Sequence, residues 1–373
     1  MPRGSMPAGV PLLSRRALNR ATLARQLLVE RARVPALEAV RWLVGLQGQV
    51  PTAPYLGLWS RVAGFRRDDL TGLLSRREVV RATTLRGTLH VIASDDYRWL
   101  RPLLQPLMAR LQRQFMGRAT AGVDPAELVA YAAELLAPEP LSRTRLRELL
   151  ARRWPDRDRS ALLHSVQYLL PLVHLPPAGT WGGRVDGPCG LAEGWLDGPL
   201  EAADPLVLVR RYLAAFGPAG VPDVQAWSGL TRLAEVVEPL RGELRVFRDE
   251  QGRELFDLPD AERPDPDTPV PPRLLPEYDN LLLSHADRSR VLGEADRRRV
   301  ITPAVAATVL VDGFVAGTWT IARRDGAATL EVRPFRPLAA ADRDALAEEA
   351  SRLLAFAAPE LPDRMVRVAE PGP

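Results

Sequence analysis

The sequence lacks lysine: all 50 of its side chains counted as Lys or Arg are arginine, against 46 Asp and Glu. The absence excludes enzymes that form a Schiff base through a lysine amine, because only the chain's amino terminus would supply an amine. Guanidinium groups pair bidentately with phosphate oxygens, so an arginine-only surface suits a nucleic acid partner. A GC-rich genome, which favours arginine codons, would give the same composition. The formal charge of +4 does not decide between these explanations.

Cysteine and metal-ligand spacings are scarce as well. The single cysteine, Cys189, cannot form an internal disulfide. The four histidines, His90, His164, His174 and His285, show neither the spacing of a zinc site nor a triad with a nucleophilic serine. No apolar run is long enough to cross a bilayer. We therefore expect a globular, cytoplasmic protein of two or three domains, with no metal, no cofactor and no membrane association.

The first third of the chain predicts helices followed by a β-hairpin. Apolar residues recur at helical spacing in "LNRATLARQLLVE", "ALEAVRWLVGLQ", "PYLGLWSRV" and "DDLTGLLSR". Two β-rich runs, "VVRAT" and "GTLHVIA", follow and are separated by a short turn. Ser94, with two aspartates after it, is then predicted to cap one long helix through "YRWLRPLLQPLMARLQRQF". Helices followed by a two-stranded wing are typical of a winged-helix unit.

The same order of elements is predicted twice more. "DPAELVAYAAELL", "SRTRLRELLARRW" and "DRSALLHSVQYLL" read as helices that lead into a hairpin in "LVHLPPAGTWGGRV", and Ser142 is predicted to cap the second of them. "DPLVLVRRYLAAF", "VPDVQAWSGL" and "RLAEVVEPL" precede the β-rich runs "ELRVFRD" and "RELFDLP". The architecture repeats without obvious repetition of sequence.

A proline- and acid-rich stretch, "LPDAERPDPDTPVPP", marks a boundary, beyond which "RLLPEYDNLLLSH" and later segments alternate in strand fashion before a closing amphipathic helix. The predicted fold class is mainly α with β-hairpins (α+β), with tandem winged-helix units bent into a concave basic face and a small C-terminal β-rich unit. The predicted units are 1–120, 121–200, 201–258, and a linker with the C-terminal unit at 259–373.

Two neutral amides, Gln47 and Gln49, stand where a helical pattern runs into two prolines. Gly48 and Pro51 favour an extended or turn conformation, in which residues two apart share a face. A primary amide both donates and accepts hydrogen bonds without charge, so two of them on one face can hold a water molecule and orient its lone pair. The alternative is a solvated helix end where glutamine is merely tolerated.

A second candidate lies in "VHLPPAGTWGG", where His174 stands at the base of a Pro- and Gly-rich hairpin with Trp181 near its predicted tip. Such a hairpin is able to enter a groove, although an ordinary surface turn has the same composition. His90 lies on the first predicted wing, where a lone histidine more often serves as a structural hydrogen-bonding group.

Four stretches together, "WLVGLQGQVPTAPYLGLWSR", "TTLRGTLHVI", "VHLPPAGTW" and "LLPEYDNLLLSHADRSR", resemble the bacterial winged-helix DNA glycosylases that unhook interstrand crosslinks, the family of the azinomycin-resistance glycosylase of Streptomyces. In that family a Gln-apolar-Gln motif is catalytic, and a related branch carries Gln-apolar-Asp. The resemblance implies catalytic roles for Gln47 and Gln49, with Gly48 as a departure at the apolar position. A His-apolar-Pro motif beside a DNA-inserting hairpin corresponds to His174, Leu175 and Pro176.

The resemblance implies a monofunctional DNA glycosylase that hydrolyses the N-glycosidic bond of bulky alkylated purines, including crosslinks, in repair or self-resistance. Its expected partner is double-stranded DNA carrying such purines, and we expect a monomer associated with the nucleoid. The expected DNA-binding residues are His174, Pro176, Trp181, Arg86 and His90. The main alternative is a winged-helix regulator that binds DNA without altering it, usually as a symmetric dimer. An unrelated small-molecule hydrolase is disfavoured because no motif supplies a nucleophile, metal or carboxylate pair.

Overall fold

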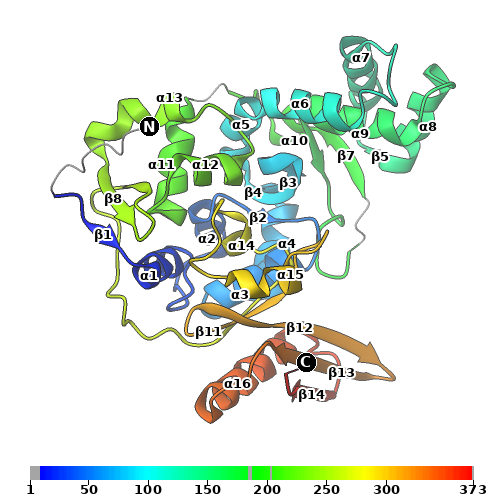
Figure 1. Cartoon of the computed structure of the whole chain (residues 1–373). Coiled ribbons are helices and arrows are strands. Elements are labelled where there is room, and N and C mark those ends of the chain that lie inside the picture. Colours follow the sequence, from blue (N-terminus) through cyan, green and yellow to red (C-terminus); the bar gives the residue numbers. More distant parts are fainter. Residues whose placement is uncertain (1–8, 184–186, 202–203, 372–373) are drawn as a thin grey trace.

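A computed structural model describes residues 9–183, 187–201 and 204–371, and shows a helix-rich body with three small sheets (Figure 1). Its mixed α and β content confirms the predicted fold class. In the part of the chain that is described, no helix is both long enough and apolar enough to cross a membrane.

The first set of elements combines helices with a three-stranded antiparallel arrangement. In chain order it contains α2 (Ala36–Trp42), β2 (Leu46–Gln47), α3 (Ala53–Arg61), α4 (Arg67–Ser75), β3 (Val79–Thr83), the 3-10 turn η1 (Leu85–Gly87) and β4 (Leu89–Ala93). Strand β4 pairs with β3 on one side and with β2 on the other. The predicted hairpin is confirmed, and β2 brings Gln47 onto its edge.

Two helices, α5 (Ser94–Leu103) and α6 (Gln105–Phe115), follow where the sequence predicts one long helix. The break reflects Pro106 in the first turn of α6, because proline has no N–H to continue the helical ladder. The predicted Ser94 cap is wrong. Ala93 is the N-cap residue of α5, and no side chain caps this helix end. The Ser94 hydroxyl instead donates a hydrogen bond to the carbonyl oxygen of Arg77.

The second set repeats the connectivity of the first. It contains α7 (Pro125–Leu136), β5 (Leu141–Ser142), α8 (Arg143–Arg153), α9 (Arg159–Leu169), β6 (Leu172–His174) and β7 (Pro188–Leu191). The Ser142 hydroxyl caps α8 as predicted, by accepting from the amide of Arg145. Strand β6 pairs with β3, so the two sets share one six-stranded sheet in the order β2-β4-β3-β6-β7-β5. We interpret each set as a winged-helix unit.

The third set follows the short helix α10 (Ala192–Leu196). It contains α11 (Pro205–Phe216), α12 (Val221–Ser228), α13 (Ala234–Val237), the 3-10 helix η2 (Glu238–Glu243), β8 (Arg245–Asp249) and β9 (Glu254–Asp257). A single bridge between Ala219 and Phe256 stands where the other sets have their first short strand. The connectivity is therefore that of the first two sets.

The N-terminal segment packs with the third set, although the sequence prediction places it in the first unit. Strand β1 (Leu12–Leu13) pairs in parallel with β8, and α1 (Arg15–Arg25) contacts α11. The apolar side chain of Leu18 packs against Phe247 of β8. A pattern along the chain does not reveal which distant strand this segment joins.

The C-terminal unit is built around a five-stranded sheet in the order β10-β11-β12-β13-β14. Its elements are β10 (Arg273–Leu275), α14 (Asn280–Leu283), η3 (Glu294–Asp296), α15 (Arg297–Val300), β11 (Thr308–Val311), β12 (Phe314–Arg324), β13 (Ala327–Pro334), α16 (Ala340–Ala357) and β14 (Asp363–Val368). The predicted strand pattern in "RLLPEYDNLLLSH" is only partly right, because α14 follows β10. Helix α16 does not close the unit, since β14 follows it and pairs with β13.

A buried ion pair joins the C-terminal unit to the first set. The Arg61 guanidinium on α3 donates to both carboxylate oxygens of Asp279, at 2.9 and 2.7 Å, and both side chains are almost fully buried. The next residue, Asn280, donates from Nδ2 to the carbonyl oxygen of Gly45 at 2.7 Å. These contacts hold the chain just after Tyr278 against the first set, and Asn280 binds the segment that leads into Gln47.

Replacing Asp279 with alanine leaves the Arg61 charge buried without its carboxylate, which costs about 3–5 kcal/mol of unfolding free energy. The matched control is Glu348→Ala, which removes an exposed carboxylate 3.1 Å from Arg352 and is expected to cost less than about 1 kcal/mol. Denaturant unfolding of both variants checks this expectation. Equal losses would show that the Arg61–Asp279 pair is not a structural anchor.

Candidate active site

Gln47 ends β2, which pairs with β4, and the chain bends at Gln49. Gln47 lies opposite His90 in the β2–β4 register, and the Gly48 amide donates to the carbonyl oxygen of Leu89 at 2.7 Å. The Gly48 carbonyl oxygen accepts from Arg81 Nε at 2.9 Å. The extended or turn conformation predicted from Gly48 and Pro51 is therefore present. Gln47 is 6% exposed, whereas Gln49 is exposed.

Gly48 lies close to the backbone of β4. A Cβ built there would lie 3.2 Å from the amide nitrogen of Val91 and 3.3 Å from the carbonyl carbon of His90. Contacts this short with backbone would push the segment away from β4. Gly48 thus permits the close approach that fixes the two flanking glutamines.

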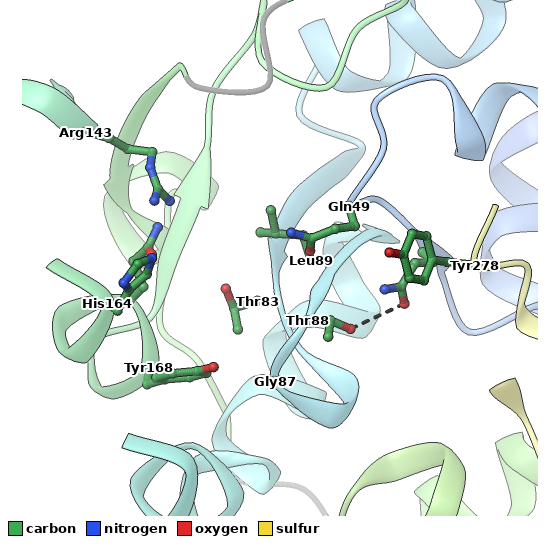
Figure 2. Close-up of a pocket in the computed structure, with 11 residues that line it drawn as sticks. Gln49, Thr83, Gly87, Thr88, Leu89, Arg143, His164, Tyr168 and Tyr278 are labelled. Carbon is green, nitrogen blue, oxygen red and sulfur yellow. Dashed lines mark hydrogen bonds between the residues drawn. The ribbon is translucent and has the colours of Figure 1, made fainter. Parts of the chain in front are cut away.

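The carboxamide of Gln47 is held by residues of the wing. Its Oε1 accepts from Arg86 Nη2 at 3.1 Å and lies 3.3 Å from the Thr88 hydroxyl, the contact drawn as a dashed line in Figure 2. Arg86 adopts a positive φ of 56° in the turn η1. Its Nη1 donates to the carbonyl oxygen of Trp227 at the end of α12. The third set therefore helps to place a group of the first.

His90 lies behind Arg86 and is fully buried. Its Nδ1 is 3.0 Å from the Thr88 carbonyl oxygen, so Nδ1 carries the proton and Nε2 accepts from Arg86 Nη2 at 3.3 Å. Burial, with the neighbouring Arg86 charge, lowers the pKa of His90 to about 3. Burial, with the charge of Arg288, lowers the pKa of Arg86 to about 10. Arg86 is half-buried and binds Gln47, and His90 is buried behind Arg86; the predicted DNA contact of these two residues stays a prediction.

Both glutamines line a cavity of about 440 Å³. Its lining residues come from the first set, the second set and the C-terminal unit: Gln47, Gln49, Thr83, Gly87, Thr88, Leu89, Arg143, His164, Gln167, Tyr168 and Tyr278. Figure 2 shows Gln49, Thr88 and Tyr278 facing Arg143, His164 and Tyr168 across the space, with Thr83 between them. The cavity is thus a cleft between the two units that share the six-stranded sheet.

The wall from the second set carries Arg143, His164, Gln167 and Tyr168. Arg143 begins α8, and His164, Gln167 and Tyr168 lie on α9. Burial and the Arg143 charge lower the pKa of His164, and burial raises the pKa of Tyr168. The sequence analysis names His164 without assigning it to this site, and it does not single out Arg143. A charged wall opposite two neutral amides suits an anionic polymer.

Tyr278 and Thr88 were also missed, although both lie in stretches that carry the family resemblance. Tyr278 adopts a positive φ of 57° just before the anchored pair Asp279 and Asn280. Such a conformation is rare for a bulky residue and is imposed by its neighbours. For Tyr278, the only signal in the sequence is the run "EYDN", which shows neither helical nor strand periodicity and so predicts no structure.

The three predicted residues of the second hairpin do not line this cavity. His174 is buried in β6 opposite Arg81, and burial lowers its pKa to about 3. Pro176 follows it and is half-buried. Trp181 does not lie at an exposed tip, because its ring meets the rings of Tyr55 and Phe356 edge-on, each at 5.6 Å. Trp181 is half-buried against Tyr55 and Phe356, and its insertion into a groove stays a prediction.

Together these features define a class of protein. An arginine-bearing cleft between two hairpin-containing units fits a nucleic acid, and two neutral amides on its wall fit the placement of water rather than proton transfer. Among the described residues, no group of three or more His, Cys, Asp or Glu side chains is arranged to hold a metal ion. The class that these features fit is a protein that acts on a nucleic acid.

Comparison with known proteins gives the family. A model of the DNA glycosylase AlkZ-like family matches residues 40–356, and the chain belongs to this family. The solved structure of the Streptomyces sahachiroi DNA glycosylase AlkZ matches with a TM-score of 0.77 and 21% identity, over 96% of this chain and 100% of that chain. No match was found among curated protein sequences. The resemblance inferred from the sequence is confirmed, and the protein is a DNA glycosylase rather than a non-catalytic regulator.

The buried histidines predict a pH dependence of stability. Because the pKa values of His90 and His174 are about 3 in the folded chain and about 6.5 when unfolded, only the unfolded state binds their protons between these values. The unfolding free energy should fall by about 1.4 kcal/mol per pH unit for each histidine as the pH drops below about 6.5. Denaturant unfolding between about pH 7 and about pH 5 measures the slope. His174→Gln should lower that slope by about 1.4 kcal/mol per pH unit, the contribution of one proton. An unchanged slope would mean that His174 is protonated in the folded protein.

Proposed function

We propose that this glycosylase releases bulky alkylated purines, including those in interstrand crosslinks, from duplex DNA by hydrolysis. The observation that carries the proposal is the presence of Gln47 and Gln49 together on the wall of an arginine-bearing cleft. The biological setting that we propose is DNA repair, or self-resistance to a DNA-alkylating natural product. We also propose that the enzyme acts as a monomer and that it works at the nucleoid, where its DNA substrate lies.

The chemistry follows from the charge of the lesion. A purine alkylated on its imidazole nitrogen is cationic, so the electron pair of the C1′–N9 bond leaves with the base and neutralises it. Water adds to C1′, and its proton passes to solvent. The enzyme must then supply a placed water and surroundings that tolerate an oxocarbenium-like sugar. Neutral amides meet this requirement without protonating the leaving group.

The absence of lysine supports a monofunctional reaction. A glycosylase that also nicks the strand forms a Schiff base with the sugar, and no lysine amine exists in this chain to do so. The expected product is therefore an intact strand with an abasic site.

The shape of the site supports crosslinked substrates. A crosslinked guanine cannot rotate out of the duplex, because it is tethered to the opposite strand. Gln49 is exposed, and the lining of the cleft comes from the first set, the second set and the C-terminal unit, which supports a site that is open at Gln49 and has no closed base pocket. The Arg143 wall lies where it can meet backbone phosphates.

Incubation of the protein with alkylated duplex DNA, followed by heat or alkali, tests the proposal through the abasic sites that it reveals. Gln49→Ala should bind the duplex as the parent protein does but lose about 100-fold or more in base release, because the water loses one of its two partners. The matched control is Gln251→Ala, which removes an exposed amide on the β8–β9 turn and should leave release unchanged. Unchanged release by Gln49→Ala would remove the glutamine from the mechanism.

The same assay tests the monofunctional reaction. Strands should break only after heat or alkali. Breaks that appear before this treatment would refute hydrolysis as the sole reaction.

A further inference from the structure

The orientation of the Gln47 carboxamide is fixed chemically. A guanidinium group carries N–H donors and no acceptor, so the Gln47 atom that faces Arg86 Nη2 at 3.1 Å has to be the carbonyl oxygen. The Thr88 hydroxyl reinforces this arrangement only in part. Its single proton is shared between Gln47 Oε1 at 3.3 Å and the Leu85 carbonyl oxygen at 3.1 Å. Arg86 is thus the main determinant.

The amide nitrogen of Gln47, Nε2, is available to a molecule in the cavity. Within the described residues, Gln47 Nε2 donates to no protein atom, yet it is not sealed from the space that Gln47 lines. Gln49 differs, because its exposed side chain has no protein hydrogen bond in the described part of the chain and is free to present either end. One amide is therefore locked and the other adapts.

We propose that Gln47 is the hydrogen-bond donor and Gln49 the acceptor for the attacking water, and that Arg86 is the positioning residue that imposes this division. The proposal rests on the proposed function. The water oxygen accepts one bond from Gln47 Nε2 and donates one proton toward Gln49 Oε1. Its second lone pair remains free and forms the bond to C1′, while the C1′–N9 pair leaves with the base.

The supports of Arg86 explain how it keeps this orientation. Its Nη1 is bound by the Trp227 carbonyl oxygen at the end of α12, and the Nε2 of neutral His90 accepts from its Nη2. Gly229 follows α12, and a Cβ there would lie 3.1 Å from the Arg86 Cα, so its missing side chain lets the helix end pack on the turn. The third set therefore acts on Gln47 through Arg86.

Identical substitutions at the two glutamines test the division of roles. A glutamate accepts hydrogen bonds but donates none when ionised. Gln49→Glu should keep single-turnover base release within about 10-fold of the parent protein and gain an acid limb near the pKa of glutamate, about 4.3. Gln47→Glu should lose about 100-fold or more, because the donor is gone, while its new carboxylate pairs with Arg86 and the protein still folds.

The outcomes separate two failures. If the parent protein releases no base from alkylated duplex, the proposed function fails. If the parent protein is active and the two glutamate variants are equally impaired, or Gln47→Glu is the more active, the division of roles is overturned.

A double-mutant cycle tests Arg86 as a positioning residue. An ammonium group in Arg86→Lys cannot bond both Trp227 and Gln47, so kcat should fall about 10-fold with little change in DNA affinity. In a Gln47→Ala background the same substitution should change the rate by less than about 2-fold, because Arg86 acts through Gln47. Effects that multiply across the two sites would show an independent or merely structural role for Arg86.

Discussion

The hydrogen bond from the Gly48 amide to the Leu89 carbonyl oxygen decides the direction of both glutamines. A slip of one residue in this pairing would turn Gln47 and Gln49 to the other face, because side chains alternate along an extended chain. Arg81 Nε donates a hydrogen bond to the carbonyl oxygen of Gly48. The lack of a side chain at Gly48 permits its close contact with β4. The rest of the molecule is arranged around keeping this short segment in register.

Each remaining part of the chain supplies one support or one wall. The second set joins the first through the β3–β6 pairing, which brings Arg143 and α9 across the cleft from the glutamines. The third set holds Arg86 by the Trp227 carbonyl oxygen. The C-terminal unit fixes the approach to Gln47 through Asn280. The site therefore depends on contacts between residues far apart in the sequence.

Sequence reasoning recovers what is local. The wing, the Ser142 cap and the extended or turn conformation at Gly48 follow from periodicity, capping preference and glycine or proline placement. The partners of a segment do not follow from such signals. Composition makes Trp181 a candidate for a hairpin tip, and only the fold shows that Phe356 of α16 covers it.

The same limit applies to charge. Arg86 and His90 lie in or beside the predicted wing. From the sequence alone, basic residues at such a position are predicted to contact DNA. In the structure, Arg86 binds Gln47 and the carbonyl oxygen of Trp227, which lies in α12, more than a hundred residues later in the chain. Burial then lowers the pKa of His90 to about 3, which turns a potential acid into a neutral acceptor. Neither burial nor the partner is encoded in local pattern.

In the proposed mechanism, neutrality at the site is itself a source of selectivity. An undamaged purine leaves as an anion unless an acid protonates it, whereas an alkylated purine leaves as a neutral base. A placed water assists both departures equally, so the discrimination lies in the leaving group and not in a tight base pocket. A strong acid in the cleft would raise the rate on intact DNA as well. His164 is the histidine that lines the cleft, and burial lowers its pKa, which disfavours the protonated form and avoids that hazard. A cleft open enough for a tethered base therefore gains its specificity from the chemistry of the lesion.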